Sequence, residues 1–179
     1  MAFWRKGIVL VTCLSILAIG LVGCGNFRQT GSPNSIADGT LEPTLQVNLY
    51  FSDRDGYLRV EKRDLPDNQR IMLAVMEELV KGPAPGSKLT DTIPEGTVVH
   101  SVILDGKVAV VDFSEEIQTN HWGGSLGESI TLFSIVNTLC QFEDVERVEI
   151  TIEGEKVVTL AGHLDLTQPL TPNENLVRD

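Results

Sequence analysis

The residues that could carry acid–base chemistry gather in one short stretch, "DFSEE" at 112–116. Its carboxylates belong to Asp112, Glu115 and Glu116, and paired carboxylates can serve a hydrolase as general acid and general base. The same residues also fit a strand that ends at Phe113, followed by a short helical turn that Ser114 caps. The acids would then lie at the N-terminus of this turn, which is the positive end of its dipole. We favour this structural interpretation, so a hydrolase is the weakest of the functions considered.

The histidines and Cys140 show no metal-binding pattern. None of His100, His121 and His163 stands at i, i+4 or at a short loop spacing from another His, Cys or Asp, as metal sites require. We therefore expect no metal and no cofactor. His100 is expected on the inward face of a strand near a sheet edge. Cys140 is expected on the apolar side of a helix, as a small core residue.

A different use of cysteine is indicated near the N-terminus. Arg5 and Lys6 are followed by an uncharged, mostly apolar run that ends in "LVGC" at 21–24. This order is typical of a secretory signal, and "LVGC" resembles the lipobox of bacterial lipoproteins. The resemblance implies cleavage between Gly23 and Cys24 and a diacylglyceryl group on the thiol of Cys24. Two acyl chains hold a protein stably at a membrane where one does not.

The alternative for this segment is an uncleaved membrane anchor. The uncharged run 7–27 is long enough, since about 20 apolar residues span a bilayer. Asn26 and the glycines near the end of the run favour the lipoprotein. In both cases we expect the remaining chain on the outer, extracytoplasmic face of the cell membrane.

The composition is that of a folded domain with extensions. Of 179 residues, 42% are hydrophobic and 22% are charged, and the net charge is −11. An acidic chain gains nothing by releasing the counterions of phosphates, which excludes nucleic acid as an expected partner. Signal residues 1–23 precede a lipidated cysteine and flexible tether over 24–44, rich in Gly, Ser, Thr, Pro and Asn. One domain is predicted over 45–167 and a disordered tail over 168–179.

Hydrophobic periodicity predicts an α+β domain in the order ββαββαββ. A first hairpin follows from the alternation in "LQVNLYF" and the return strand "YLRVEKRD", in which Leu58 and Val60 should face inward. A helical stripe then ends at Gly82-Pro83. The stripe consists of Met72, Val75, Met76 and Leu79.

Two more hairpins and a second long helix complete the predicted fold. The hairpin 97–114 should turn at Asp105-Gly106, a pair that suits a type I′ turn. A helix is predicted over 124–142, and the last hairpin, 145–157, should turn at Gly154-Glu155. Antiparallel hairpins with two helices favour a two-layer sandwich, in which an antiparallel-rich sheet carries both helices on one face.

The central hairpin is apolar on both faces. One set of residues should face the helices, namely Val102, Ala109, Val111 and Phe113. The alternation then leaves Val99, Ile103, Val108 and Val110 on the far face, where the other strands are polar. An exposed apolar set of this kind marks an interaction surface. The alternative is that the 83–96 loop or the C-terminal segment covers it.

A second candidate for binding is the loop "NHWGGS" at 120–125, which places Trp122 between His121 and two glycines. An aromatic side chain in such a loop can anchor a partner or stack on a sugar. The alternative is that Trp122 closes one end of the core.

The order and spacing of several segments resemble one known family. These segments are "LYF", Gly82-Pro83, "IPEGT", "DGKVAVVDFS", "IVNTLCQF", "VERVEITIEGEKV" and "GHLDLTQPL". Over about residues 45–170 they are similar to the sporulation and spore-germination domain GerMN. The resemblance implies an extracytoplasmic α+β module of Gram-positive bacteria, similar in fold to ring-building motifs and without a catalytic residue pattern. Some members carry two copies in tandem, and this chain carries one.

These expectations combine into a non-catalytic, lipid-anchored module for protein interaction or assembly in sporulation, germination or cell-envelope complexes. Its partners would be the membrane, through diacylglyceryl-Cys24, and either an envelope protein or a second copy, through sheet edges or the apolar hairpin face. The alternative is a module that binds peptidoglycan through Trp122.

Overall fold

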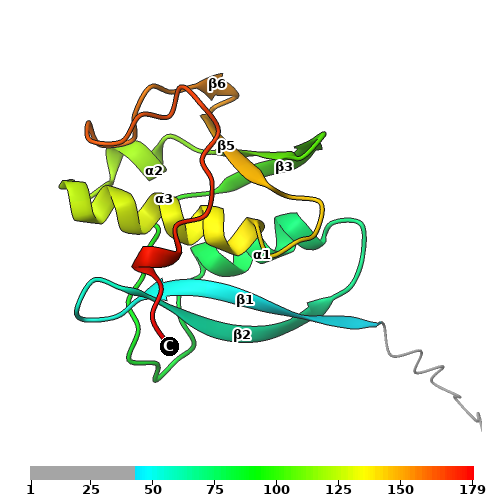
Figure 1. Cartoon of the computed structure of the whole chain (residues 1–179). Coiled ribbons are helices and arrows are strands. Elements are labelled where there is room, and N and C mark those ends of the chain that lie inside the picture. The colour runs from blue at the N-terminus through cyan, green and yellow to red at the C-terminus, as the bar shows by residue number, and fades with distance from the viewer. Residues whose placement is uncertain (1–42) are drawn as a thin grey trace, which may run out of the picture. The chain divides into compact units, whose positions relative to one another are not determined.

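The computed structural model describes residues 43–179, drawn in colour in Figure 1. Contacts divide the chain into two units, Met1–Gly39 and Thr40–Asp179, and the described residues belong to the second. The predicted signal, Cys24 and tether lie outside the described residues, apart from Pro43 and Thr44. The elements are β1 Thr44–Ser52, β2 Leu58–Pro66, α1 Ile71–Val80, β3 Val99–Asp105, β4 Val108–Phe113, α2 Glu116–Thr119, α3 Ser125–Leu139, β5 Arg147–Ile152, β6 Glu155–Lys156 and a 3₁₀ turn at Glu174–Leu176.

The predicted α+β class and the order ββαββαββ are confirmed, with α2 as an additional short helix. The strands form two sheets instead of one. β1 and β2 make an antiparallel pair, and the other sheet has the order β3-β4-β5-β6. Its β4–β5 pair is parallel, because α3 carries the chain back across the sheet between them. α1 and α3 lie between the β1–β2 hairpin and the larger sheet (Figure 1), so they are covered from two sides.

Side chains of α3 and the turn after it explain why the first hairpin stays separate. The Gln141 side chain accepts a hydrogen bond from Asn48 N–H at 2.7 Å and donates one to Asn48 C=O at 2.9 Å. The Thr138 hydroxyl accepts from Tyr50 N–H at 3.3 Å. These bonds use backbone groups at the free edge of β1 that another strand would need. The edge is therefore closed by side chains.

The core joins both sheets to the helices. The inward residues predicted for β1 and α1 are largely confirmed, since Val47, Leu49, Phe51, Val75 and Met76 are fully buried. The rest of the core comes mainly from β4, β5 and α3. Most of α3 is buried, including polar residues, because a helix between two layers has little solvent-facing surface.

The two predicted tight turns are each displaced by one residue. Asp105 pairs with Val108, so the turn residues are Gly106 and Lys107. Gly106 has φ +60° and Lys107 has no positive φ, as in a type II′ turn, which needs glycine only at its first central position. The type I′ conformation occurs instead at Glu153-Gly154, where φ is +51° and +78°.

A β-bulge in β3 corrects the predicted orientation of two residues. The register shifts between Val99 and Ser101, and Val99 pairs directly with the buried Phe113. Val99 therefore faces the core, and His100 is exposed instead of inward. An extra residue in one strand exchanges the inward and outward side chains beyond the bulge. The hydrophobic periodicity of the sequence does not predict its position.

β2 departs from its expected burial as well. Leu58 is buried, but Val60 is exposed. The positions of β2 that lie beside Val47 and Leu49 are occupied by Arg63 and Glu61. The side of the hairpin that faces α1 therefore contains charged groups that pair with one another.

The tail predicted as disordered, 168–179, is instead packed against the domain. Leu170 bridges to Val148 in both directions through backbone hydrogen bonds of 2.8 and 2.9 Å. Arg178 N–H donates to Leu58 C=O at 3.0 Å, and its guanidinium lies 3.5 Å from the centre of the Tyr57 ring. Backbone pairing and a cation–π contact thus order a segment whose prolines suggested disorder.

Candidate functional site

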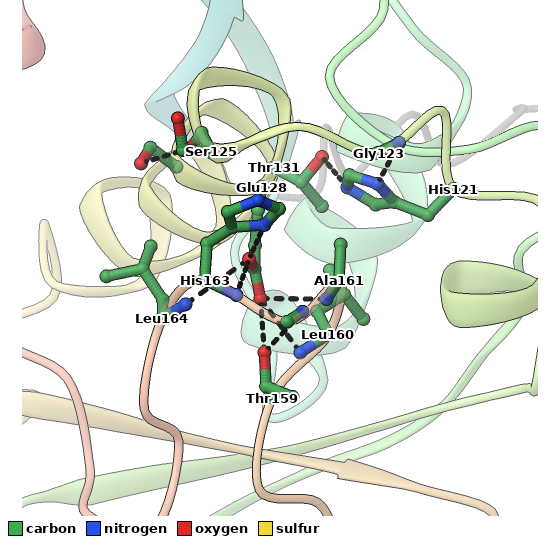
Figure 2. A network of polar contacts seen from close by, with 12 residues as sticks. His121, Gly123, Ser125, Glu128, Thr131, Thr159, Leu160, Ala161, His163 and Leu164 are labelled. Carbon is green, nitrogen blue, oxygen red and sulfur yellow. Dashed lines mark hydrogen bonds and ion pairs between the residues drawn. The ribbon is translucent and has the colours of Figure 1, made fainter.

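The loop between α2 and α3 is held by His121. Its Nδ1 accepts a hydrogen bond from Gly123 N–H at 2.9 Å, and its Nε2 lies 3.2 Å from the Thr131 hydroxyl, as Figure 2 shows. The Thr131 hydroxyl in turn donates to Thr92 C=O at 2.7 Å. This arrangement requires a neutral ring with its proton on Nε2. Burial lowers the pKa of His121 below its usual 6.5 and favours the same neutral form.

Trp122 is presented to solvent by this loop. Its ring stacks on His121 with 5.0 Å between ring centres, and 52% of the residue is exposed. A Cβ at Gly127 would lie only 2.6 Å from Trp122 Nε1. The indole can therefore approach the first turn of α3 this closely because position 127 has no side chain.

A groove of about 400 Å³ runs beside Trp122. Leu126, which is 55% exposed, lines it together with Gly56 of the β1–β2 turn. Asp91 lines this groove and also a second hollow of about 520 Å³ beyond Trp122, which contains Glu95. We call the first hollow the Trp122 groove. It combines exposed apolar side chains with an acidic edge.

Glu128, which no sequence pattern singled out, is the most strongly perturbed acid described. It lies in the first turn of α3 and is completely buried. One oxygen accepts from the Thr159 hydroxyl at 2.8 Å and from the N–H groups of Leu160 and Ala161 at 3.0 and 2.8 Å. Burial alone would raise its pKa, but these bonds lower the pKa to about 2.

The other oxygen of Glu128 is bound in the same way. It accepts from His163 N–H at 2.8 Å and Leu164 N–H at 3.3 Å, and His163 Nδ1 lies 3.2 Å away (Figure 2). The carboxylate thereby fastens the 159–164 loop to the start of α3, close to Trp122 in sequence. With both oxygens occupied and a pKa near 2, Glu128 is suited to a structural role and not to proton transfer at neutral pH.

The carboxylates of "DFSEE" do not converge on a common point. Asp112 accepts from the Thr151 hydroxyl at 2.7 Å and from Gly154 N–H at 2.8 Å, so it supports the β5–β6 turn. β4 ends at Phe113, as predicted, and Glu116 lies in the first turn of α2. The predicted Ser114 cap is wrong, since its hydroxyl accepts from Val98 N–H at 2.9 Å and α2 has no side-chain cap.

The apolar set on the far side of the central hairpin is smaller than expected. Ile103 is 61% exposed and lies opposite Val110 in the ladder, and Val108 and Val110 are half-buried. Val99 is removed from the set by the bulge. Neighbouring positions on β5 are Arg147 and Glu149, which border the surface with charge.

Residues 43–179 show three further features, which concern thiol reactivity, metal binding and the membrane. Burial raises the pKa of Cys140 to about 11, so its thiol is protonated and unreactive at neutral pH. Within this part of the chain, no cluster of His, Cys, Asp and Glu has the arrangement of a metal site. Its helices are also too short or too polar to cross a bilayer.

Comparison with known proteins connects this architecture to one family. Residues 48–158 match the family described as "Germane: Sporulation and spore germination". The spore germination protein GerM of Bacillus subtilis strain 168 is 27% identical over 119 residues, which cover 64% of this chain and 31% of that relative. This chain therefore corresponds to less than a third of that protein.

Solved structures share the fold. The tandem GerMN domains of the Bacillus subtilis sporulation protein GerM match with a TM-score of 0.62 at 24% identity, covering 72% of this chain and 46% of that one. A putative lipoprotein from Clostridium perfringens matches with a TM-score of 0.54 at 20% identity, over 77% of this chain and 95% of that one. At these identities the likeness extends to the fold alone.

Proposed function

Because this chain belongs to the Germane family of sporulation and spore germination, we propose that it is a non-catalytic protein-interaction module of a sporulation, germination or cell-envelope complex. The Trp122 groove carries this proposal. Exposed tryptophan beside exposed leucine is unfavourable in water, and aromatic anchors in desolvated pockets dominate the energetics of protein interfaces. A partner that covers Trp122 and Leu126 would remove this cost.

The edge of the groove suggests the chemistry of the partner segment. Asp91 is exposed and lines both hollows that Trp122 borders, and Glu95 lies in the second of them. An apolar side chain next to a lysine or arginine would fill the groove and complement these acids.

We propose further that the domain is held at the outer face of the cell membrane through diacylglyceryl-Cys24. The lipobox "LVGC" supports the anchor. A tether of about 20 flexible residues has a root-mean-square span of roughly 25 Å, so the domain could reach partners near the membrane surface in many orientations. Metabolic labelling with a clickable fatty acid tests this part, because Cys24→Ala should abolish labelling of the full chain.

Site-specific photocrosslinking in the producing cells tests the interaction role. The full chain would carry a photoreactive phenylalanine analogue at Leu126 or, as a control, at Val158, which is at least as exposed to solvent but lies outside the groove. We expect a discrete adduct from position 126 that Trp122→Ala removes. Absence of an adduct at 126, or the same adduct from both positions, contradicts the proposal.

A glycan ligand is the second candidate for the same groove. The observation that favours it is that the exposed indole and Asp91 line the same groove, since sugars stack on aromatic rings and donate hydroxyl hydrogens to acids. Pull-down with purified peptidoglycan distinguishes it. Glycan binding predicts loss with Trp122→Ala and retention with Trp122→Phe, which preserves a stacking surface.

Self-association would use the far face of the central hairpin, where Ile103 is exposed beside Val110. It predicts a molar mass in light scattering that grows with protein concentration. Val110→Glu should then return the mass to that of a monomer, and Val158→Glu, a control at an exposed site elsewhere, should not.

A further inference from the structure

The four-stranded sheet ends in an open strand, β3, at one side. β3 pairs with β4 alone, in an antiparallel ladder closed by the two-residue turn at Gly106-Lys107. In such a ladder alternate residues bond to the partner strand, beginning with Asp105 beside the turn. The backbone N–H and C=O groups of Val102 and Leu104 therefore point away from β4. No hydrogen bond from elsewhere in residues 43–179 reaches them.

This open edge differs from those of β1 and β6. The edge of β1 is closed by Gln141 and Thr138, as described above. At the opposite side of the larger sheet, β6 consists of Glu155 and Lys156 alone. Proteins commonly shorten or block edges because an open one recruits other strands. β3 keeps seven residues and an unblocked edge.

A groove of about 330 Å³ lies along this edge, between β3 and the start of α1. Met72 and Leu73 line it from the helix, and Val102 and Leu104 from the strand. All four side chains are half-buried or exposed. An added strand would direct every second side chain into this space, since side chains alternate between the faces of a sheet.

One cation stands at the groove without an acidic partner. Arg70 lines the groove, is exposed, and makes no ion pair with another residue of the described chain. The chain as a whole carries a net charge of −11. On an acidic protein, an isolated positive group attracts an acidic segment of a partner that the rest of the surface repels.

We propose that this groove binds an extended segment of a protein partner, which pairs with β3 as an added strand, places alternate apolar side chains over Met72 and Leu73, and sets an acidic residue beside Arg70. Strand addition of this kind takes its affinity from backbone hydrogen bonds and its specificity from the alternate side chains. The inference extends the interaction role proposed above to a second surface, which is separate from the Trp122 groove.

The experiment uses the unit 40–179, which contains the whole described core. ¹⁵N-labelled protein is titrated with two capped peptides of alternating valine and threonine that carry one aspartate, at the N-terminus in one and at the C-terminus in the other. We expect the amide signals of Val102 and Leu104 to shift with one of the two, because only one strand direction brings the acid to Arg70. The indole N–H signal of Trp122 should stay in place, which separates this surface from the groove.

Matched variants identify the backbone as the binding group. Leu104→Pro removes an outward N–H without touching the β3–β4 bonds, and proline is tolerated on edge strands. Leu104→Ala removes most of the same side chain and keeps the N–H. We expect the proline variant to bind at least about fivefold more weakly than the alanine variant, the effect of losing one hydrogen bond. Equal affinities of the two variants would overturn the proposal.

If Leu104→Pro fails to fold, reversing the charge at position 70 and in the peptide still tests the proposal. Arg70→Glu should lose binding of the aspartate peptide and gain binding of the same peptide with lysine in its place. Absence of shifts at Val102 and Leu104 with either original peptide would overturn the proposal. So would a concentration-dependent change at these amides without peptide, because a second copy of the chain would then occupy the edge.

Discussion

Gly123 N–H points at Nδ1 of His121 from 2.9 Å, so the loop that presents Trp122 depends on an unprotonated ring nitrogen. Protonation would replace this acceptor with a second donor and break the bond. The exposure of the tryptophan is thus coupled to the ionisation of its neighbour in the chain.

This coupling predicts a pH response. Because the pKa of His121 in the folded state is below 6.5, the unfolded chain binds the proton more readily. The stabilisation by neutral His121 is therefore complete above about pH 6.5 and is lost as the pH falls through the lower folded-state pKa. We expect the fluorescence of Trp122 in the fragment 40–179 to change with a midpoint below 6.5. Trp4 lies outside that fragment, so the signal belongs to Trp122 alone.

The control for this response is His121→Asn, whose side-chain oxygen can accept the Gly123 hydrogen but does not titrate. It should flatten the fluorescence profile, whereas His163→Asn should leave the midpoint unchanged. A midpoint that follows His163 instead would contradict the role assigned to His121.

Glu128→Gln should destabilise the domain strongly. The amide replaces one accepting oxygen with a donor that faces backbone N–H groups, and a pKa lowered from 4.5 to about 2 corresponds to about 3 kcal/mol of stabilisation. We expect a loss of about 2–4 kcal/mol in urea unfolding at pH 7. Glu149→Gln on the surface of the sheet is the matched control.

The same group predicts acid sensitivity. Since the folded-state pKa of Glu128 is depressed, its contribution is complete above about pH 4.5 and is lost as the pH falls toward 2. Unfolding free energies measured at pH 5 and pH 3 should differ more in the unsubstituted protein than in Glu128→Gln. Equal differences would show that other carboxylates dominate acid unfolding.

Gly127→Ala should separate stability from the position of the tryptophan. The new methyl group would meet Trp122 Nε1 at 2.6 Å and displace the indole. Alanine also favours a helix over glycine by about 1 kcal/mol. This gain opposes the cost of displacing the indole, so the unfolding free energy should change little. We expect altered Trp122 fluorescence and loss of the Leu126 photoadduct in a folded protein. Ser129→Ala, a change at a half-buried position of the same helix outside the groove, should alter neither.

Arg63→Met should weaken the packing of α1 on the first hairpin. The Arg63 guanidinium bonds Glu61 at 2.7 Å, Glu78 at 2.7 Å and Gly82 C=O at 2.6 Å, in a setting that is largely shielded from water. Removing it leaves the partly buried Glu61 without a cation and Glu78 with only the exposed Lys81 as its ion-pair partner, for which we expect a loss of about 1–3 kcal/mol in urea unfolding. Lys62→Met, on the exposed side of the same strand, should cost far less.

Periodicity alone predicted the elements whose residues follow one rule throughout. The buried stripe of Val75, Met76 and Leu79 in α1 is of this kind, as is the alternation of Ala109, Val111 and Phe113 in β4. These residues repeat at the period of their element, and the core takes the face that they form.

Features that depend on a single backbone irregularity could not be predicted in this way. The bulge before Ser101 reverses Val99 and His100, and the type II′ turn at Gly106 places the turn one residue later than predicted. Nothing in the residue types distinguishes these from the regular alternatives, because Asp105-Gly106 suits a type I′ turn equally well.

Polar contacts between residues far apart in the sequence could not be predicted either. Glu128 is indistinguishable in sequence from an acid that simply favours a helix N-terminus, since its bonding partners lie about thirty residues later at 159–164. The Trp122 loop, by contrast, was recognisable from its composition. Its exposure was not, because that follows from His121 and Gly127 together.

The Gln141 side chain that closes β1 also sets how far strand addition could propagate. A molecule with unpaired edge strands at both ends can polymerise, because every subunit that joins offers a new binding site to the next. Here the larger sheet has one long free strand, β3, while Gln141 closes the β1 side of the separate β1–β2 pair. The β1 edge of one copy therefore cannot pair with the β3 edge of the next, which blocks that route from a single recruited strand to a fibre.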